Sequence, residues 1–126
     1  MFYFLIKQNF YIVYLILLLL IMDLTQQQWI SKQKIDSSSM ILDVRTKEEY
    51  HEGHIPGAIL IDVTKTENFV SEIQSLDKSL SYYVYCRSGQ RSSKACYLMS
   101  EVGIENGFNL LGGILEWKGD LIKLKP

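Results

Sequence analysis

The sequence has few of the residues that build a disulfide framework or a zinc site. It contains two cysteines, Cys86 and Cys96, and two histidines among 126 residues. Two cysteines do not make a disulfide framework, and no Cys/His group has the spacing of zinc ligands. An excess of either charge is also missing, because 13 basic and 14 acidic residues give a formal net charge of −1. The composition therefore favours a thiol role for at least one cysteine and gives no indication of nucleic-acid binding.

A long hydrophobic run is found only near the amino terminus. Residues 10–22 (FYIVYLILLLLIM) are all apolar, a length that is short for a spanning helix and suits the core of a signal peptide. Neither a small-residue cleavage site nor a cysteine for lipidation follows. Three interpretations stay open: a signal peptide, an uncleaved anchor extended by residues 2–6, or translation from a wrongly chosen start codon. The protein would be exported or membrane-anchored in the first two cases, and cytoplasmic if translation starts at Met22.

The rest of the chain suits one domain. A hydrophobic content of 48% is enough for a core, and the length fits a single domain. Thr25 with Gln28 forms the pattern of a capping box, so we expect folded structure to begin at about Met22. The prediction is a hydrophobic segment at residues 1–21 and one domain at residues 22–126.

Short apolar runs alternate with helical patterns after residue 24, which is typical of an α/β domain with a largely parallel sheet. Strands are expected at residues 40–44, 58–61, 82–86 and 108–111, and their near-continuous hydrophobicity suits strands covered on both faces. Helices are expected at residues 25–34, from Thr46 to near Gly53, across residues 69–76, across residues 95–102 with Gly103 following, and at residues 115–121.

Cys86 stands between an apolar strand and the polar stretch Arg-Ser-Gly-Gln-Arg, which leads into a helix. Ligands gather at the carboxyl edge of parallel sheets, and a helix N-terminus favours an anion. Gly89 can take the positive φ that turns backbone N–H groups inward, and Arg87 and Arg91 add positive charge. Such surroundings lower a cysteine pKa from about 8.5 to between about 3.5 and 7.5. We expect Cys86 to be a nucleophile; the alternative is that it only packs at a strand end, as we expect for Cys96 in its helix.

Three segments in this order resemble the rhodanese family of single-domain sulfurtransferases. They are residues 41–58 (ILDVRTKEEYHEGHIPGA), 86–92 (CRSGQRS) and 109–117 (NLLGGILEW), and the resemblance covers about residues 24–124. It implies a three-layer α/β fold with a central, mostly parallel five-stranded sheet and helices on both faces. It also implies a sulfurtransferase that moves sulfane sulfur from a donor such as thiosulfate to a thiophilic acceptor through a persulfide on Cys86.

The resemblance implies roles for single residues. Cys86 would be the catalytic cysteine, and the active-site loop whose amides point at its sulfur would be Arg87, Ser88, Gly89, Gln90 and Arg91. Arg87 would attract the anionic donor, and Arg91 would brace the loop by pairing with a carboxylate of the Glu48–Glu49 region. Asp43 and Arg45 match a motif that lies against the loop, although Arg45 could equally be a solvated surface charge. His54, Pro56 and Gly57 belong to a motif that is mainly architectural.

The resemblance implies no metal or organic cofactor. The expected partners are a small anionic sulfur donor and a thiol or cyanide acceptor, with no nucleic acid, and membrane association only through residues 1–21; we expect a monomer. A phosphatase or arsenate reductase of related fold is one alternative, but such loops are one residue longer than the four residues between Cys86 and Arg91. A non-catalytic or regulatory rhodanese module is another, although inactive modules usually lack the cysteine.

Overall fold

The computed structural model describes the backbone of residues 1–124 and the side chains of residues 1–17 and 22–124. Residues 125–126, the end of the expected domain, lie outside the described residues. Five strands form one sheet in the order β1–β5–β4–β2–β3. They are β1 (Asp23–Leu24), β2 (Ser39–Asp43), β3 (Ile59–Leu60), β4 (Ser81–Tyr85) and β5 (Gly107–Leu110).

Every pairing between these described strands is parallel. In register, Asp43 lies opposite Tyr85, and Val84 lies opposite Asn109, so the carboxyl ends of β2, β4 and β5 meet at one edge. The predicted α/β class with a five-stranded sheet is therefore confirmed. The four expected strands lie within about two residues of their predicted positions, and the two-residue strand β1 is an addition at the sheet edge.

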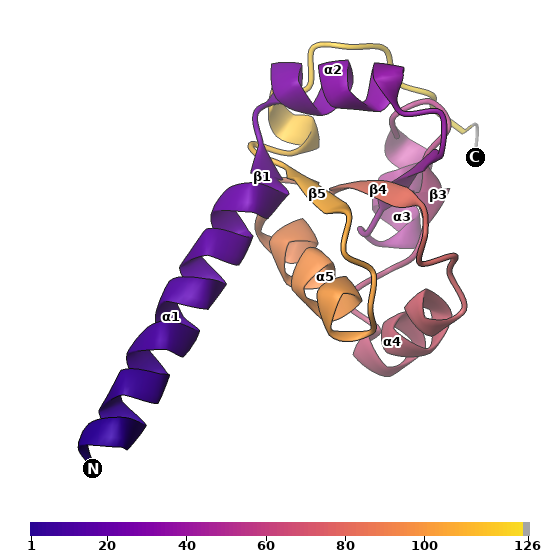
Figure 1. Cartoon of the computed structure of the whole chain (residues 1–126). Coiled ribbons are helices and arrows are strands. Elements are labelled where there is room, and N and C mark those ends of the chain that lie inside the picture. The colour runs from indigo at the N-terminus through magenta and orange to yellow at the C-terminus, as the bar shows by residue number, and fades with distance from the viewer. Residues whose placement is uncertain (125–126) are drawn as a thin grey trace.

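Helices cover both faces of the sheet (Figure 1). They are α2 (Gln26–Ile35), α3 (Lys47–Glu52), α4 (Thr66–Gln74) and α5 (Gln90–Glu101), besides α1 (Phe2–Met22) and a 3-10 turn η1 (Ile114–Glu116). One core cluster joins Phe69 of α4 and Met99 of α5 to inward side chains of the sheet such as Leu42. The other cluster joins Trp29 of α2 to the opposite face, through Tyr83. The three-layer arrangement follows from these two cores.

Local sequence signals account for the helix ends. Thr25 caps α2, and the Thr25 and Gln28 side chains bond each other's backbone N–H groups; Thr46 and Glu49 do the same at α3. Both predicted capping boxes are thus confirmed. Gly103 follows α5 with a φ of 96° and ends the helix as predicted.

The predicted helix at residues 115–121 is wrong. Only the 3-10 turn η1 forms there, and Trp117 is already extended, with a φ of −65° and a ψ of 127°. The reason lies in tertiary pairing, because Ile122 forms an antiparallel bridge with His54, with hydrogen bonds of 2.9 and 2.8 Å. Gly119 adds a poor helix former to the same stretch.

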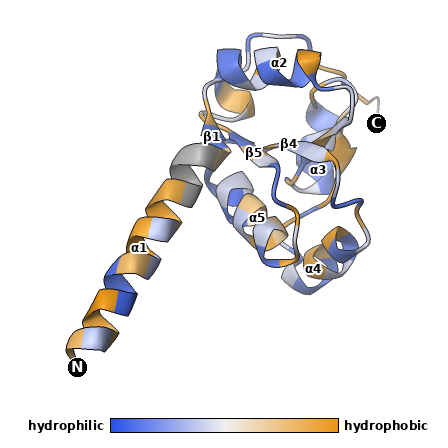
Figure 2. Ribbon diagram, viewed as in Figure 1, coloured by the Kyte–Doolittle hydropathy of each residue, from blue (hydrophilic) through white to orange (hydrophobic). Residues whose placement is uncertain are grey.

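Helix α1 projects from the sheet and runs into β1 at its carboxyl end (Figure 1). Its described residues are mostly hydrophobic (Figure 2). Most of their side chains are exposed, with Phe2 at 78% and Phe10 at 71% exposure. Met22, by contrast, is 3% exposed and belongs to the core. In the described part of the chain we find no helix with both the length and the apolar character needed to cross a membrane.

Candidate active site

Cys86 directly follows β4, at the carboxyl edge of the sheet. The residue is 1% exposed, whereas Arg87 and Ser88 after it are exposed, so the chain passes from core to surface at the cysteine. Gly89 then takes a φ of 105° and starts α5. This left-handed conformation suits glycine and turns the loop back toward the sulfur.

The loop donates hydrogen bonds to the Cys86 sulfur. The Gly89 amide donates to Sγ across 3.1 Å, and the Ser92 hydroxyl donates to Sγ across 3.3 Å. Burial, the largest single effect, acts to raise the pKa of the Cys86 thiol. The Ser92 hydroxyl and the amides of Ser92, Gly89 and Ser88 act to lower this pKa, and together they bring it below the ordinary value. A lowered pKa increases the thiolate fraction near neutral pH.

Arg91 forms a two-pronged ion pair with Glu49 on α3. Its Nη1 donates to Oε1 across 2.8 Å, and its Nη2 donates to Oε2 across 2.9 Å. The hydrogen bond from Arg91 is the main cause that lowers the pKa of Glu49 from 4.5 to about 2. The expected contact with the Glu48–Glu49 region is therefore present. Because the guanidinium is already paired, Arg91 gives the Cys86 thiolate less positive charge than the sequence alone suggested.

Arg87 and Gln90 lie exposed on the loop. Within the described part of the chain, the Arg87 guanidinium makes no hydrogen bond or ion pair with another side chain. Its charge is therefore available to an anion that approaches Cys86 from solvent.

Asp43 and Arg45 are both buried, so the alternative of a solvated Arg45 is wrong. Arg45 Nη2 donates to Asp43 Oδ2 across 2.6 Å and to the Gly53 carbonyl across 2.7 Å. The Tyr85 hydroxyl donates to the same carboxylate across 2.6 Å. These bonds tie β2 to the residue before Cys86 and to the turn that follows α3. The pair thus braces the elements around the loop, and no hydrogen bond from it to residues 86–91 exists among the described residues.

The turn at Gly112–Gly113 lies directly behind the cysteine loop. The Ile114 amide donates to the Cys86 carbonyl across 3.0 Å, and the Leu115 amide donates to the Arg87 carbonyl across 3.1 Å. A Cβ on Gly113 would overlap the Arg87 carbonyl oxygen and lie 2.6 Å from the Cys86 carbonyl oxygen. The glycine is therefore needed for the close approach of two backbones.

Two further buried residues, Ser92 and Asn109, complete the site and were not among the expected site residues. The Ser92 hydroxyl also lies 2.5 Å from Asn109 Oδ1, and Asn109 Nδ2 donates to Asp23 Oδ1 across 2.9 Å. The sequence could have indicated Asn109, because a polar side chain inside an apolar strand needs a buried hydrogen-bond partner. Asp23 carried no such signal, since β1 is too short to show a strand pattern.

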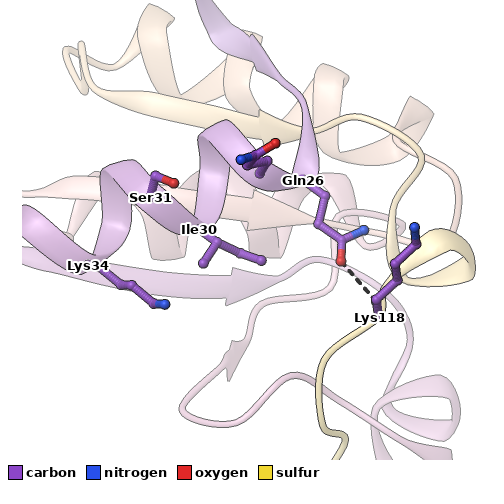
Figure 3. A pocket seen from close by; sticks show the side chains of 6 residues that line it. Gln26, Ile30, Ser31, Lys34 and Lys118 are labelled. Carbon is purple, nitrogen blue, oxygen red and sulfur yellow. Dashed lines mark hydrogen bonds between the residues drawn. The ribbon is translucent and has the colours of Figure 1, made fainter.

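Other features of the molecule contribute no chemistry to this site. Cys96 is fully buried in α5, and its burial raises the pKa of the thiol far above the ordinary value. Among the described residues, no three His, Cys, Asp or Glu side chains gather as a metal site. A surface hollow of about 400 Å³ lies along α2 beside Ile30, Lys34 and Lys118, and none of its lining residues is in the Cys86 loop (Figure 3).

The fold and the site define a class of α/β proteins that hold a cysteine in a loop between a parallel strand and a helix. A family model described as Rhodanese-like domain matches residues 26–120. The chain therefore belongs to the rhodanese-like sulfurtransferase family, as the sequence resemblance indicated.

Individual proteins similar to this chain support the same family. The Bacillus subtilis protein named "Putative sulfur carrier protein YrkF" is 39% identical over 90 residues, which are 70% of this chain and 47% of YrkF. A sulfurtransferase of Allochromatium vinosum is 35% identical over 89 residues, or 70% of this chain and 80% of that protein. The crystal structure of a rhodanese-like domain protein from Staphylococcus aureus superposes with a TM-score of 0.68 at 31% identity, covering 82% of this chain and 98% of that one. The matched segment is thus about half of YrkF and nearly all of the Staphylococcus domain.

Proposed function

We propose that the protein transfers sulfane sulfur from an anionic donor such as thiosulfate to a thiophilic acceptor, with Cys86 as the carrier. The observation that carries this proposal is the ring of donors at the cysteine, above all the Gly89 amide 3.1 Å from Sγ. Such donors stabilise a thiolate before the reaction and an anionic persulfide after it. Membership of a sulfurtransferase family supports the same chemistry.

In the first half of the reaction, the Cys86 thiolate attacks the outer sulfur of thiosulfate. A bond forms between Sγ and that sulfur, the bond to the sulfonate group breaks, and sulfite leaves with the electron pair. In the second half, an acceptor such as cyanide or a thiolate attacks the outer sulfur of the persulfide and releases the Cys86 thiolate. No general base is needed, because the attacking groups are already anions. The exposed guanidinium of Arg87 attracts the donor.

The loop length supports sulfur transfer over phosphate chemistry. Four residues separate Cys86 from Arg91, and Arg91 is held by Glu49. A phosphatase loop uses its arginine to bind the oxyanion, and here that guanidinium is occupied. A non-catalytic binding role would need no hydrogen-bond donors directed at Sγ. The geometry therefore favours a role for Cys86 as the carrier of sulfane sulfur.

The test compares thiocyanate production from thiosulfate and cyanide by the full chain, by Cys86→Ser and by Cys96→Ala. We expect activity in the wild type and in Cys96→Ala, and none in Cys86→Ser. A mass increase of about 32 Da on the Cys86 peptide after thiosulfate treatment would identify the persulfide. Equal thiocyanate production by Cys86→Ser would disprove the assignment, and Cys86-dependent hydrolysis of an aryl phosphate would favour the phosphatase.

A further inference from the structure

A chain of hydrogen bonds connects the reacting sulfur with the first strand of the domain. The Ser92 hydroxyl lies 3.3 Å from Cys86 Sγ and 2.5 Å from Asn109 Oδ1. The Asn109 amide continues the chain, because Nδ2 donates to Asp23 Oδ1 across 2.9 Å and to the Gly89 carbonyl across 3.1 Å. Ser92 is fully buried and Asn109 is 2% exposed, so solvent does not offer these groups other partners.

Ser92 has one hydroxyl hydrogen and two acceptors within reach. It can donate either to Sγ or to Asn109 Oδ1, and not fully to both. The orientation of Asn109 is fixed, because both neighbours of Nδ2, the Asp23 carboxylate and the Gly89 carbonyl, are acceptors. Oδ1 therefore always faces Ser92 and competes with the sulfur for the same hydrogen.

We propose that Ser92 is a state-dependent donor to Cys86, which bonds Sγ when the sulfur is a thiolate and turns to Asn109 when the sulfur is protonated or carries sulfane sulfur. Ser92 contacts the reacting atom, whereas Asn109 and Asp23 are positioning residues that act through it. A thiolate is a far better acceptor than a neutral divalent sulfur, which decides between the two positions of the hydroxyl. The proposal deepens the proposed function and rests on it for the sulfane-bearing state.

The two half-reactions use this donor in opposite ways. Stabilising the thiolate makes Cys86 a better leaving group when the acceptor removes the outer sulfur. The same hydrogen bond makes the fully formed thiolate a weaker nucleophile toward the donor, since nucleophilicity falls with pKa. Ser92 therefore favours discharge of the persulfide over its formation at a pH where the thiol is fully ionised.

Several other groups lie on the elements packed around Cys86, and the test leaves all of them unchanged. They are Arg87 and Arg91 of the loop and α5, Glu49 of α3, Asp62 after β3, Asp23 of β1, Cys96 of α5 and Glu116 of η1. A change seen on replacing Ser92 alone therefore reports on the hydroxyl, whereas a change on replacing Asn109 reports on the competing acceptor together with the lost bond to Asp23.

The first experiment measures the rate of Cys86 alkylation by iodoacetamide against pH, with Cys86 followed by peptide mass. We expect Ser92→Ala to raise the midpoint of the alkylation rate by about one pH unit. Below the midpoint this corresponds to about tenfold less thiolate. Asn109→Ala removes the competing acceptor and should move the midpoint lower, while Gly89 keeps its bond from the Ser93 amide. The double variant should match Ser92→Ala, because Asn109 acts through Ser92.

Ser93→Ala is the matched control, since the Ser93 hydroxyl has no hydrogen bond in the described part of the chain. Equal midpoints for Ser92→Ala and Ser93→Ala would overturn the proposal, as would shifts of the same sign for Ser92→Ala and Asn109→Ala. If Ser92→Ala does not fold by circular dichroism, Asn109→Ala decides alone: a lower midpoint supports the proposal, and an unchanged or higher midpoint overturns it.

The second experiment follows each half-reaction about two pH units above the higher of the wild-type and Ser92→Ala alkylation midpoints. With Ser92→Ala we expect persulfide formation from thiosulfate to be about threefold faster and discharge by cyanide to be several-fold slower. Equal slowing of both would indicate structural damage and overturn the proposal. If the wild type gains no sulfur from thiosulfate, the proposed function fails, whereas the alkylation midpoints still decide whether Ser92 serves the thiolate.

Discussion

At the scale of single residues, Glu49 shows how one carboxylate supports two structures. It caps the start of α3 through Thr46 and holds Arg91 at the start of α5. Its side chain is 26% exposed, so part of the ion pair lies away from solvent. The residue therefore links helix formation to the position of the cysteine loop.

The lowered pKa of Glu49 predicts a defined acid sensitivity. Pairing with Arg91 lowers this pKa from 4.5 to about 2, so the contribution to stability is complete above about pH 4.5 and disappears as the pH falls toward about 2. We expect Glu49→Gln, which can still cap α3, to lower the free energy of unfolding by about 1 kcal/mol near neutral pH. Urea unfolding at several pH values checks this, and a loss that does not shrink on acidification would contradict it.

The sequence predicted the conformation or contacts of some residues in and near the loop, and not those of others. The positive φ of Gly89 followed from a glycine between a strand and a helix, because few other residues serve there. The pairing of Arg91 with the Glu48–Glu49 region rested on resemblance alone. Ser92 and Asn109 are distant in sequence, and their 2.5 Å contact depends on the register of β4 with β5. Such a contact cannot be predicted from the sequence before the strand register is known.

At the scale of elements, short-range signals were the reliable ones. The two capping boxes and Gly103 set helix ends correctly, because each depends on residues within one turn. Strand β1 was not predicted, and the segment after η1 was wrongly predicted as a helix, because pairing with distant residues decides both. Leu24 lies opposite Leu110, and Ile122 bridges His54. Propensity over a few residues cannot report such partners.

Two glycines with positive φ allow a matched test of the turn behind the loop. A Cβ at Gly113 would meet the backbone of Cys86 and Arg87, whereas a Cβ at Gly57, with a φ of 84°, would meet nothing within 4 Å. We expect Gly57→Ala to cost about 1–2 kcal/mol of stability through backbone strain alone and to leave Cys86 alkylation unchanged. Gly113→Ala should add displacement of the loop and slow alkylation at least about tenfold. Thermal unfolding and alkylation rates measure both effects, and equal behaviour of the two variants would refute the close approach.

At the scale of the whole molecule, the junction between α1 and the sheet joins the amino-terminal segment to the active-site loop. Met22 packs in the core, Leu24 pairs with β5, and Asp23 holds the Asn109 amide. The described side chains of α1 before this point are mostly exposed. We therefore propose that the domain begins at Met22, and a pair of truncations tests this boundary.

A chain that begins at Met22 keeps the pairing of β1 with β5 and the hydrogen bond from Asn109 to Asp23, and it should unfold within a few degrees of the full chain. A chain that begins at Thr25, after an initiator methionine, keeps the cap of α2 but loses Met22, Asp23 and Leu24. Burial of Met22 alone is worth about 1.5–3 kcal/mol, so we expect at least that loss of stability. Without Asp23, the Asn109 amide also loses one of its two fixed acceptors, so the alkylation midpoint of Cys86 should change only in this shorter chain. Thermal unfolding and alkylation of the three chains provide the measurement. An unfolded Met22 chain would show that α1 is part of the domain, and equal stability of both truncations would show that β1 contributes nothing to it.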